Sequence, residues 1–469
     1  MKKKLLSMCL GLLFCGSAMA QMEILYDGAS LTTTTLTDGT TLVQFPEDVV
    51  FNTTDFQNKI SVTVDDSSVA NDAIVPNPAT TFITENEIET FVYGGKAYSF
   101  RFTAGEYFTV VMFSDPHVDT EDIKNSVTTK TAAMANLGKE GGRVITFSTL
   151  PGYTAKADLV MCLGDMDEDK PVNTSYDGST GYFEAATAVF HENSIPFITL
   201  AGNHDIHCDY FNDGSKGMTS GSPTSNALYT SEGGGQYWTE KALNLVKTTY
   251  NNAAADGSFT VETINSTTGA DNEPGHFTFK YKGVRFYCAN NYWWQKPWDD
   301  NGSKYYSAKS TLDALSTYVD NHATDASIWV SHFPFRAAGW NAEDASERWW
   351  LDQNYQGENG AESQSILPSG DSEYYTSAAF TTEEGKAVAQ KKKDYLADIV
   401  VKSKNPAHFS GHAHLNHILD VTATNGTKFT DRSVQPITST GESNGYAGNA
   451  FVVLCKGGVG VVEVQRVTF

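Results

Sequence analysis

The sequence contains little cysteine, few basic residues and no long hydrophobic run. Its six Cys are too few for a disulfide scaffold in a chain of 469 residues. Lys and Arg number 33 against 56 Asp and Glu, and such an acidic surface repels nucleic acid and anionic membranes. No stretch approaches the roughly 20 apolar residues that a membrane span needs. We therefore expect neither long nucleic acid nor a membrane span.

The first twenty residues have the pattern of a signal peptide. Lys2 to Lys4 form a positive n-region, Leu5 to Leu13 is a short apolar run, and Ala18 to Ala20 is an A-x-A cleavage site. Cleavage would remove three Lys and no acidic residue, which leaves 30 basic against 56 acidic residues and a net charge of −26. We expect an exported protein, periplasmic or extracellular, that begins at Gln21.

Four cysteines remain after that cleavage, namely Cys162, Cys208, Cys288 and Cys455. Cys162 and Cys455 lie inside apolar, strand-like runs, so buried free thiols are the expected state. One or two disulfides are the alternative.

Residues 21–105 are rich in Thr and contain short β-like runs such as Thr41–Phe45 and Ile60–Val64. Turn residues separate these runs, and the region contains no His. We expect a small β-rich N-terminal domain whose role is docking or spacing.

From residue 106 to 469 strands alternate with helices, which predicts an α/β core with parallel strands. The expected strands are 108–113, 157–163, 195–201, 327–330, 407–410, 450–454 and 460–467, with a hairpin over 275–287 that turns at Lys282-Gly283. The expected helices are 124–137, 183–192, 307–321 and 385–402. Segments 207–274 and 335–380 interrupt this pattern as insertions, the first with a helix over 241–252.

Polar motifs follow five of the expected strands and contain five of the eleven His. They are Asp115-Pro116-His117, Gly164-Asp165, Gly202-Asn203-His204-Asp205, His332 and Gly411-His412-Ala413-His414. Ligands bind at the carboxyl edge of open α/β sheets, where such motifs would meet. Carboxylate, amide oxygen and imidazole together suit first-row transition metals better than Ca²⁺ or a thiolate site.

Each motif has an ordinary structural interpretation when it is taken alone. Gly164-Asp165 and Gly202-Asn203 are common turn pairs. Asp115 with His117 fits a solvated loop, and His332 fits a structural histidine. His412 and His414 differ, because two residues apart on an extended segment they would point to the same side and favour a ligand pair by themselves. For the other motifs, only the ordered set of all five favours a metal site.

The ordered set resembles the calcineurin-like metallophosphoesterase superfamily, whose motifs are D-x-H, G-D, G-N-H-[DE], H and G-H-x-H. The resemblance extends from about Phe108 to Leu419, and residues 21–105 lie outside it. It implies an α/β fold of the four-layer αββα metallophosphoesterase type, preceded here by the small β-rich domain.

The resemblance also implies a role for each motif residue. The first metal would be held by Asp115, His117 and His414, the second by Asn203, His332 and His412. Asp165 would bridge both metals. His204 would face the substrate and assist the leaving group, and Asp205 would orient its ring.

The resemblance further implies two divalent or trivalent transition-metal ions, such as Mn, Fe or Zn. A metal-bridging hydroxide attacks phosphorus in a small phosphate mono- or diester. The chain looks somewhat like the secreted branch with purple acid phosphatases and acid sphingomyelinase-like phosphodiesterases, although no Tyr stands at a motif position.

Two other functions stay open. A secreted binding or adhesion protein built on an inactive phosphoesterase core would have lost metal ligands, and none is lost here. A nucleotidase or nuclease would be restricted to short nucleotides by the acidic surface.

Some residues near the motifs match none of them. Three of them are histidines that could at most contact metal ligands without binding the metal themselves, namely His207, His408 and His417. Three tryptophans, Trp293, Trp294 and Trp298, either line a substrate groove or cap the sheet.

Overall fold

The structure is a computed structural model of the chain. It describes residues 21–118, 120–166, 182–200, 202, 259–264, 276–289, 308–332, 334–335, 383–411, 417–438 and 448–469. The chain forms two compact units that divide between Ala104 and Gly105. Each unit is described by itself.

The N-terminal unit consists of two four-stranded sheets with the strand orders β2-β1-β5-β6 and β3-β4-β8-β7. The strands are β1 (Met22–Tyr26), β2 (Ala29–Ser30), β3 (Thr32–Thr35), β4 (Thr41–Phe45), β5 (Ile60–Val64), β6 (Ser67–Val69), β7 (Ile88–Tyr93) and β8 (Lys96–Ala104). Both sheets contribute to one core: the first supplies aliphatic residues such as Ile24 and Val62, and the second supplies Phe45, Phe91 and Phe102. Phe56 of the short helix α1 (Thr54–Lys59) joins them. The predicted β-rich character of this region is confirmed.

The second unit contains a five-stranded sheet of order β11-β10-β9-β19-β20. Its strands are β9 (Tyr107–Phe113), β10 (Leu159–Cys162), β11 (Phe197–Thr199), β19 (Asn449–Lys456) and β20 (Gly460–Thr468). β9, β10 and β11 are parallel, with Cys162 opposite both Phe113 and Thr199. The carboxyl ends of these three strands therefore meet at one edge.

A seven-stranded sheet of order β12-β13-β14-β15-β16-β18-β17 lies in the same unit. Its strands are β12 (Val261–Ile264), β13 (His276–Tyr281), β14 (Val284–Ala289), β15 (Ala326–Ser331), β16 (Lys404–Ser410), β17 (His417–Thr422) and β18 (Lys428–Ser433). β14, β15, β16 and β18 are parallel neighbours. Each residue of β14 and β15 is buried, as expected for strands covered on both faces.

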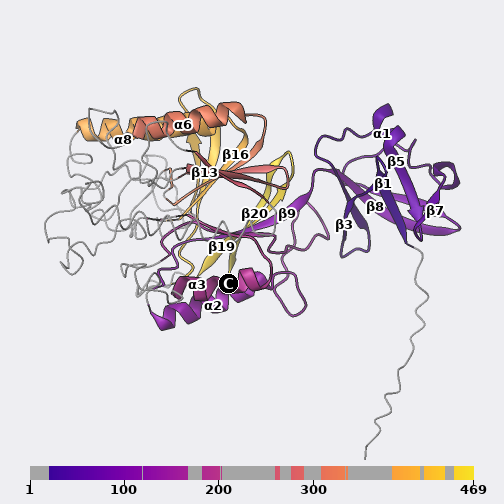
Figure 1. The fold of residues 1–469 in the computed structure, drawn as a ribbon, viewed down its shortest axis with the longest axis horizontal. Helices are drawn as coiled ribbons and strands as arrows, with labels where there is room; N and C mark the ends of the chain where they lie inside the picture. The colour runs from indigo at the N-terminus through magenta and orange to yellow at the C-terminus, as the bar shows by residue number, and fades with distance from the viewer. Residues whose placement is uncertain are drawn as a thin grey trace, which may run out of the picture. The chain divides into compact units, whose positions relative to one another are not determined.

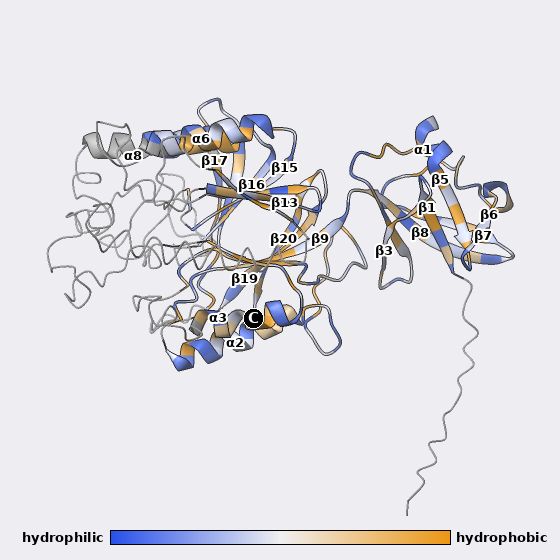
Figure 2. Ribbon diagram, in the orientation of Figure 1, coloured by the Kyte–Doolittle hydropathy of each residue, from blue (hydrophilic) through white to orange (hydrophobic). Residues whose placement is uncertain are grey.

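The two sheets form the inner layers of a four-layer sandwich (Figure 1). Helices α2 (Glu121–Ala135) and α3 (Tyr182–Glu192) cover the five-stranded sheet, and α6 (Ala308–Asn321) and α8 (Glu383–Val400) cover the other. Figure 2 shows hydrophobic residues along the strands and hydrophilic ones on the exposed turns of the outer helices. The predicted αββα architecture is confirmed.

The hairpin over β13 and β14 turns at Lys282 and Gly283, as predicted, and both residues have positive φ (45° and 78°). The hairpin of β17 and β18 was not predicted. Its turn contains Asn425-Gly426, with φ of 84° at Gly426, and this dipeptide is a known hairpin signal.

Several predictions fall outside the described residues: the signal peptide, the helix over 241–252, Cys208, and most of the two insertions. Cys162, Cys288 and Cys455 are buried free thiols. Within the described residues, no helix is long and apolar enough to cross a membrane.

Candidate metal centre

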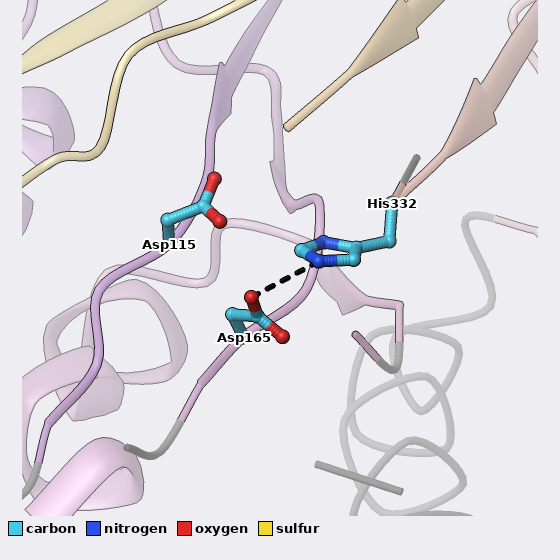
Figure 3. Close-up of side chains that lie close together, drawn as sticks. All are labelled: Asp115, Asp165 and His332. Atoms are coloured by element: carbon cyan, nitrogen blue, oxygen red, sulfur yellow. Dashed lines mark ion pairs between the residues drawn. The ribbon is translucent and has the colours of Figure 1, made fainter. Parts of the chain in front are cut away.

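The carboxyl ends of β9, β10 and β15 bring three predicted ligands together (Figure 3). Asp115, Asp165 and His332 each offer a ligand atom, and these atoms lie within 4.8 Å of one another. All three side chains are at most 1% exposed. Residues that lie more than 200 positions apart in the sequence thus meet because both sheets present their strand ends to the same place.

The ring of His332 is held in a defined orientation. Its Nδ1 lies 2.8 Å from the carbonyl oxygen of Leu163, and a carbonyl only accepts, so Nδ1 carries a proton. Its Nε2 lies 3.0 Å from Oδ2 of Asp165. Burial by itself lowers the pKa of His332, but the charges of Asp165 and Asp115 and the bond to Leu163 raise it to about 9.

His117 lies beside the same two carboxylates. Its Nε2 is 3.9 Å from Oδ1 of Asp115 and 3.9 Å from Oδ2 of Asp165, and the ring is fully buried. Four of the predicted ligands are therefore neighbours, with Asp165 next to both imidazoles. This central place fits the bridging role expected for Asp165.

The backbone at these residues is unusual. Asp115, His117 and Asp165 have positive φ of 51°, 42° and 53°, a left-handed region that non-glycine residues rarely occupy. The amides of Asp115 and His117 donate to the carbonyls of Gly164 and Asp165, both at 3.1 Å, which keeps the two loops side by side. Such backbone strain is concentrated at functional sites.

Three glycines of the predicted motifs allow close approach to these side chains. A Cβ on Gly202 would lie 2.1 Å from Oδ1 of Asp165, and one on Gly411 would lie 2.6 Å from Oδ2 of Asp115. A Cβ on Gly164, where φ is +107°, would lie 2.5 Å from Nδ1 of His332. Only glycine fits at these three positions without displacing its neighbours.

The donor set fits a transition-metal ion. Two buried carboxylates next to each other are costly unless a cation compensates their charge. Two carboxylates with two imidazoles form the mixed oxygen and nitrogen set that Mn, Fe and Zn accept. The hydrogen bond from Nδ1 of His332 to Leu163 is also the support that a metal-binding imidazole usually has.

The remaining predicted site residues, Asn203, His204, Asp205, His412 and His414, lie outside the described residues. The structure does describe the glycines that precede them: Gly202 follows β11 and Gly411 follows β16. The amide of Gly411 donates to the carbonyl of His332 at 2.8 Å, so the segment leading to His412 starts beside the described cluster.

Asp431 was not predicted as a site residue. This carboxylate is completely buried on β18 and lies 2.6 Å from the ring of His408. The Asn425-Gly426 dipeptide before β18 predicts a hairpin turn, and the strand that carries Asp431 could have been predicted from it.

Comparison with known proteins identifies a family. The profile of the calcineurin-like phosphoesterases matches residues 108–416. No curated protein matches the chain.

Two solved structures give alignments with low similarity. A purple acid phosphatase from yellow lupin (Lupinus luteus) seeds is 13% identical with a TM-score of 0.31, covering 96% of this chain and 69% of the lupin chain. GAP50, the anchor in the inner membrane complex of Plasmodium, is 11% identical with a TM-score of 0.29, covering 77% of this chain and 89% of its own. At such TM-scores neither protein informs the activity of this chain.

The family match covers about two thirds of the sequence and includes Asp115, His117, Asp165 and His332. On this basis the chain belongs to the calcineurin-like phosphoesterase family.

Proposed function

We propose that this phosphoesterase is an exported enzyme with a dinuclear metal centre that hydrolyses small phosphate mono- or diesters. The observation that carries the proposal is the buried cluster of Asp115, Asp165 and His332, with ligand atoms within 4.8 Å of one another. Its location at the joined carboxyl ends of two sheets is where open α/β folds bind ligands.

The described residues would supply four ligands. Asp115 and His117 would hold one ion and His332 the other, and Asp165 would bridge them. Asn203, His412 and His414 would complete the two ligand sets, as their motifs predict. When bound, two such ions lower the pKa of a water between them and neutralise charge that develops on phosphoryl oxygens.

The chain's own residues have distinct tasks in this reaction. The carboxylates would hold the cations, and the bond from His332 to Leu163 leaves Nε2 as the atom that would bind one of them. His204 would donate a proton to the departing ester oxygen, because imidazole titrates in the useful pH range. Asp205 would hold the His204 ring in position.

Charge supports a small substrate. The chain has a formal net charge of −23, which opposes binding of long nucleic acid. Bound cations would nevertheless make the site locally positive and attract a phosphate group. Export to the periplasm or the cell exterior is proposed from the pattern of residues 1–20.

Hydrolysis of p-nitrophenyl phosphate and bis-p-nitrophenyl phosphate tests the proposal. The protein is first treated with a chelator and then assayed with added Mn, Fe or Zn, each compared with Mg and Ca. We expect activity to disappear on chelation and to return with a transition metal. A chain that binds no transition metal and cleaves neither ester would instead be a binding protein on an inactive core.

A further inference from the structure

Three neighbouring strands of the seven-stranded sheet contribute a chain of buried polar side chains behind His332. Ser331 ends β15, His408 lies on β16 and Asp431 on β18, and each is at most 1% exposed. Oγ of Ser331 lies 2.8 Å from Nε2 of His408, whose Nδ1 lies 2.6 Å from Oδ1 of Asp431. A carboxylate only accepts, so Nδ1 carries a proton, and in the neutral ring Nε2 accepts the Ser331 hydroxyl.

The second oxygen of Asp431 holds another part of the chain. Oδ2 accepts a hydrogen bond of 3.0 Å from the backbone amide of Phe335. The Phe335 ring packs edge-on against His408, with ring centroids 4.8 Å apart. Asp431 therefore holds residues on both sides of His332. It contacts Ser331 through His408, and it accepts directly from the backbone amide of Phe335.

β18 also supports the neighbouring loop. The hydroxyl of Ser433 donates to the carbonyl of Gly411 at 3.0 Å, and the amide of Gly411 donates to the carbonyl of His332 at 2.8 Å. One strand thus supports the His332 segment and the residue that precedes the predicted ligand His412.

The order Ser331, His408, Asp431 is that of a catalytic triad, but its surroundings are different. A nucleophilic serine must reach a substrate carbonyl, whereas Ser331 is 1% exposed. Buried ionic groups contribute little net stability, since well-packed apolar residues do as well or better. What the hydrogen bonds provide is a fixed arrangement of three strand ends.

We propose that Ser331, His408 and Asp431 are positioning residues that set the backbone on both sides of His332, and so the imidazole, for metal binding. This inference rests on the proposed metal site. It predicts that breaking the chain of hydrogen bonds weakens metal binding although no ligand is changed.

The test titrates the metal-free full chain with Co²⁺, followed by calorimetry and by the visible absorption of the bound ion, which reports ligand geometry. Asp431→Asn should lower Co²⁺ affinity by up to about 10-fold and alter the spectrum; this is the low end of the range for residues that hydrogen-bond a ligand directly, because Asp431 acts through His408 and Ser331. Ser331→Ala, which removes one hydroxyl, should act in the same direction by a smaller factor.

The matched control is Ser403→Ala. Ser403 is buried just before β16, and its Oγ lies 2.7 Å from Oγ of Ser327 and 3.0 Å from Nε1 of Trp329, both on β15. Ser327 lies at the end of β15 away from the site. This variant should lose thermal stability but bind Co²⁺ with unchanged affinity and spectrum.

Wild-type affinity and spectrum in both site variants, or effects no larger than those of Ser403→Ala, would overturn the positioning role while leaving the metal site intact. If Asp431→Asn does not fold, Ser331→Ala decides. A wild-type chain that binds no Co²⁺ would overturn the metal site, and with it this inference.

Discussion

Gly202 allows a sharp test of the site, because it touches Asp165 without offering a side chain of its own. A Cβ at this position would lie 2.1 Å from Oδ1 and 2.3 Å from the backbone nitrogen of Asp165, where ordinary contact begins near 3.4 Å. The backbone clash alone requires the two loops to separate by about 1.1 Å, the difference between 3.4 and 2.3 Å. Rotation of the Asp165 side chain cannot relieve the clash with the backbone atom.

The expected cost of Gly202→Ala follows from this displacement. Overpacking costs about 1–3 kcal/mol of stability, which a unit of this size should survive. Misplacing a reactive group by about 1 Å costs roughly 100-fold in activity, and we expect a similar loss of Mn²⁺ affinity, about 2.7 kcal/mol. Calorimetric titration of the metal-free protein measures it.

Gly142→Ala is the matched control. Its Cβ would lie 1.9 Å from the backbone oxygen of Asn136, in a turn that contributes no site residue. The control should lose comparable stability and keep Mn²⁺ affinity. Unchanged Mn²⁺ affinity in folded Gly202→Ala would refute the placement of Asp165 against Gly202.

Two further predictions concern acid stability and proton transfer. Burial by itself raises the pKa of Glu463, but hydrogen bonds from Thr149, Gln465 and Ser148 lower it to about 2. The ionised carboxylate therefore stabilises the fold above a pH of about 4.3, and this stabilisation is lost as the pH falls toward 2. Urea unfolding of Glu463→Gln should show a loss of up to about 1 kcal/mol at pH 7 that vanishes toward pH 2; a constant difference would contradict this. His204→Gln should keep its metals and lose more rate for esters with poor leaving groups than for p-nitrophenyl esters, and equal losses in steady-state assays would contradict a leaving-group role.

The strands that carry the site residues could be predicted because a strand buried on both faces is a continuous apolar run in the sequence. Phe108–Phe113 and Leu159–Cys162 are continuous apolar runs followed by polar residues, and both are fully buried. Parallel strands end at one edge, so polar residues after such runs must come together. Asp115 and Asp165 meet for this reason, and His332 joins them because the seven-stranded sheet presents the end of β15 at the same place.

β18 could not be predicted by the same logic. Its buried positions are Phe429, Asp431 and Ser433, and two of the three are polar, so the alternation of hydrophobic residues that marks a half-buried strand is missing. Helix α2 was predicted to start at Lys124 but begins at Glu121, where the Thr120 side chain accepts from the Ile123 amide at 3.3 Å. The cap residue and the acidic first turn were the signals for that start.

The left-handed backbone conformation of Asp115, His117 and Asp165 could not be predicted from the sequence either. Local preference opposes this conformation for non-glycine residues. It is imposed by the pairing of the two loops through the carbonyls of Gly164 and Asp165, which exists only after both strands are in place.

The bridging role proposed for Asp165 can be tested by measuring metal content. Elemental analysis of the purified wild-type chain, reconstituted with Mn²⁺, should give two ions per chain. Asp165→Asn should fold and lose most of both ions together with phosphoesterase activity. Full metal content and normal turnover in Asp165→Asn would show that Asp165 does not bridge the two ions.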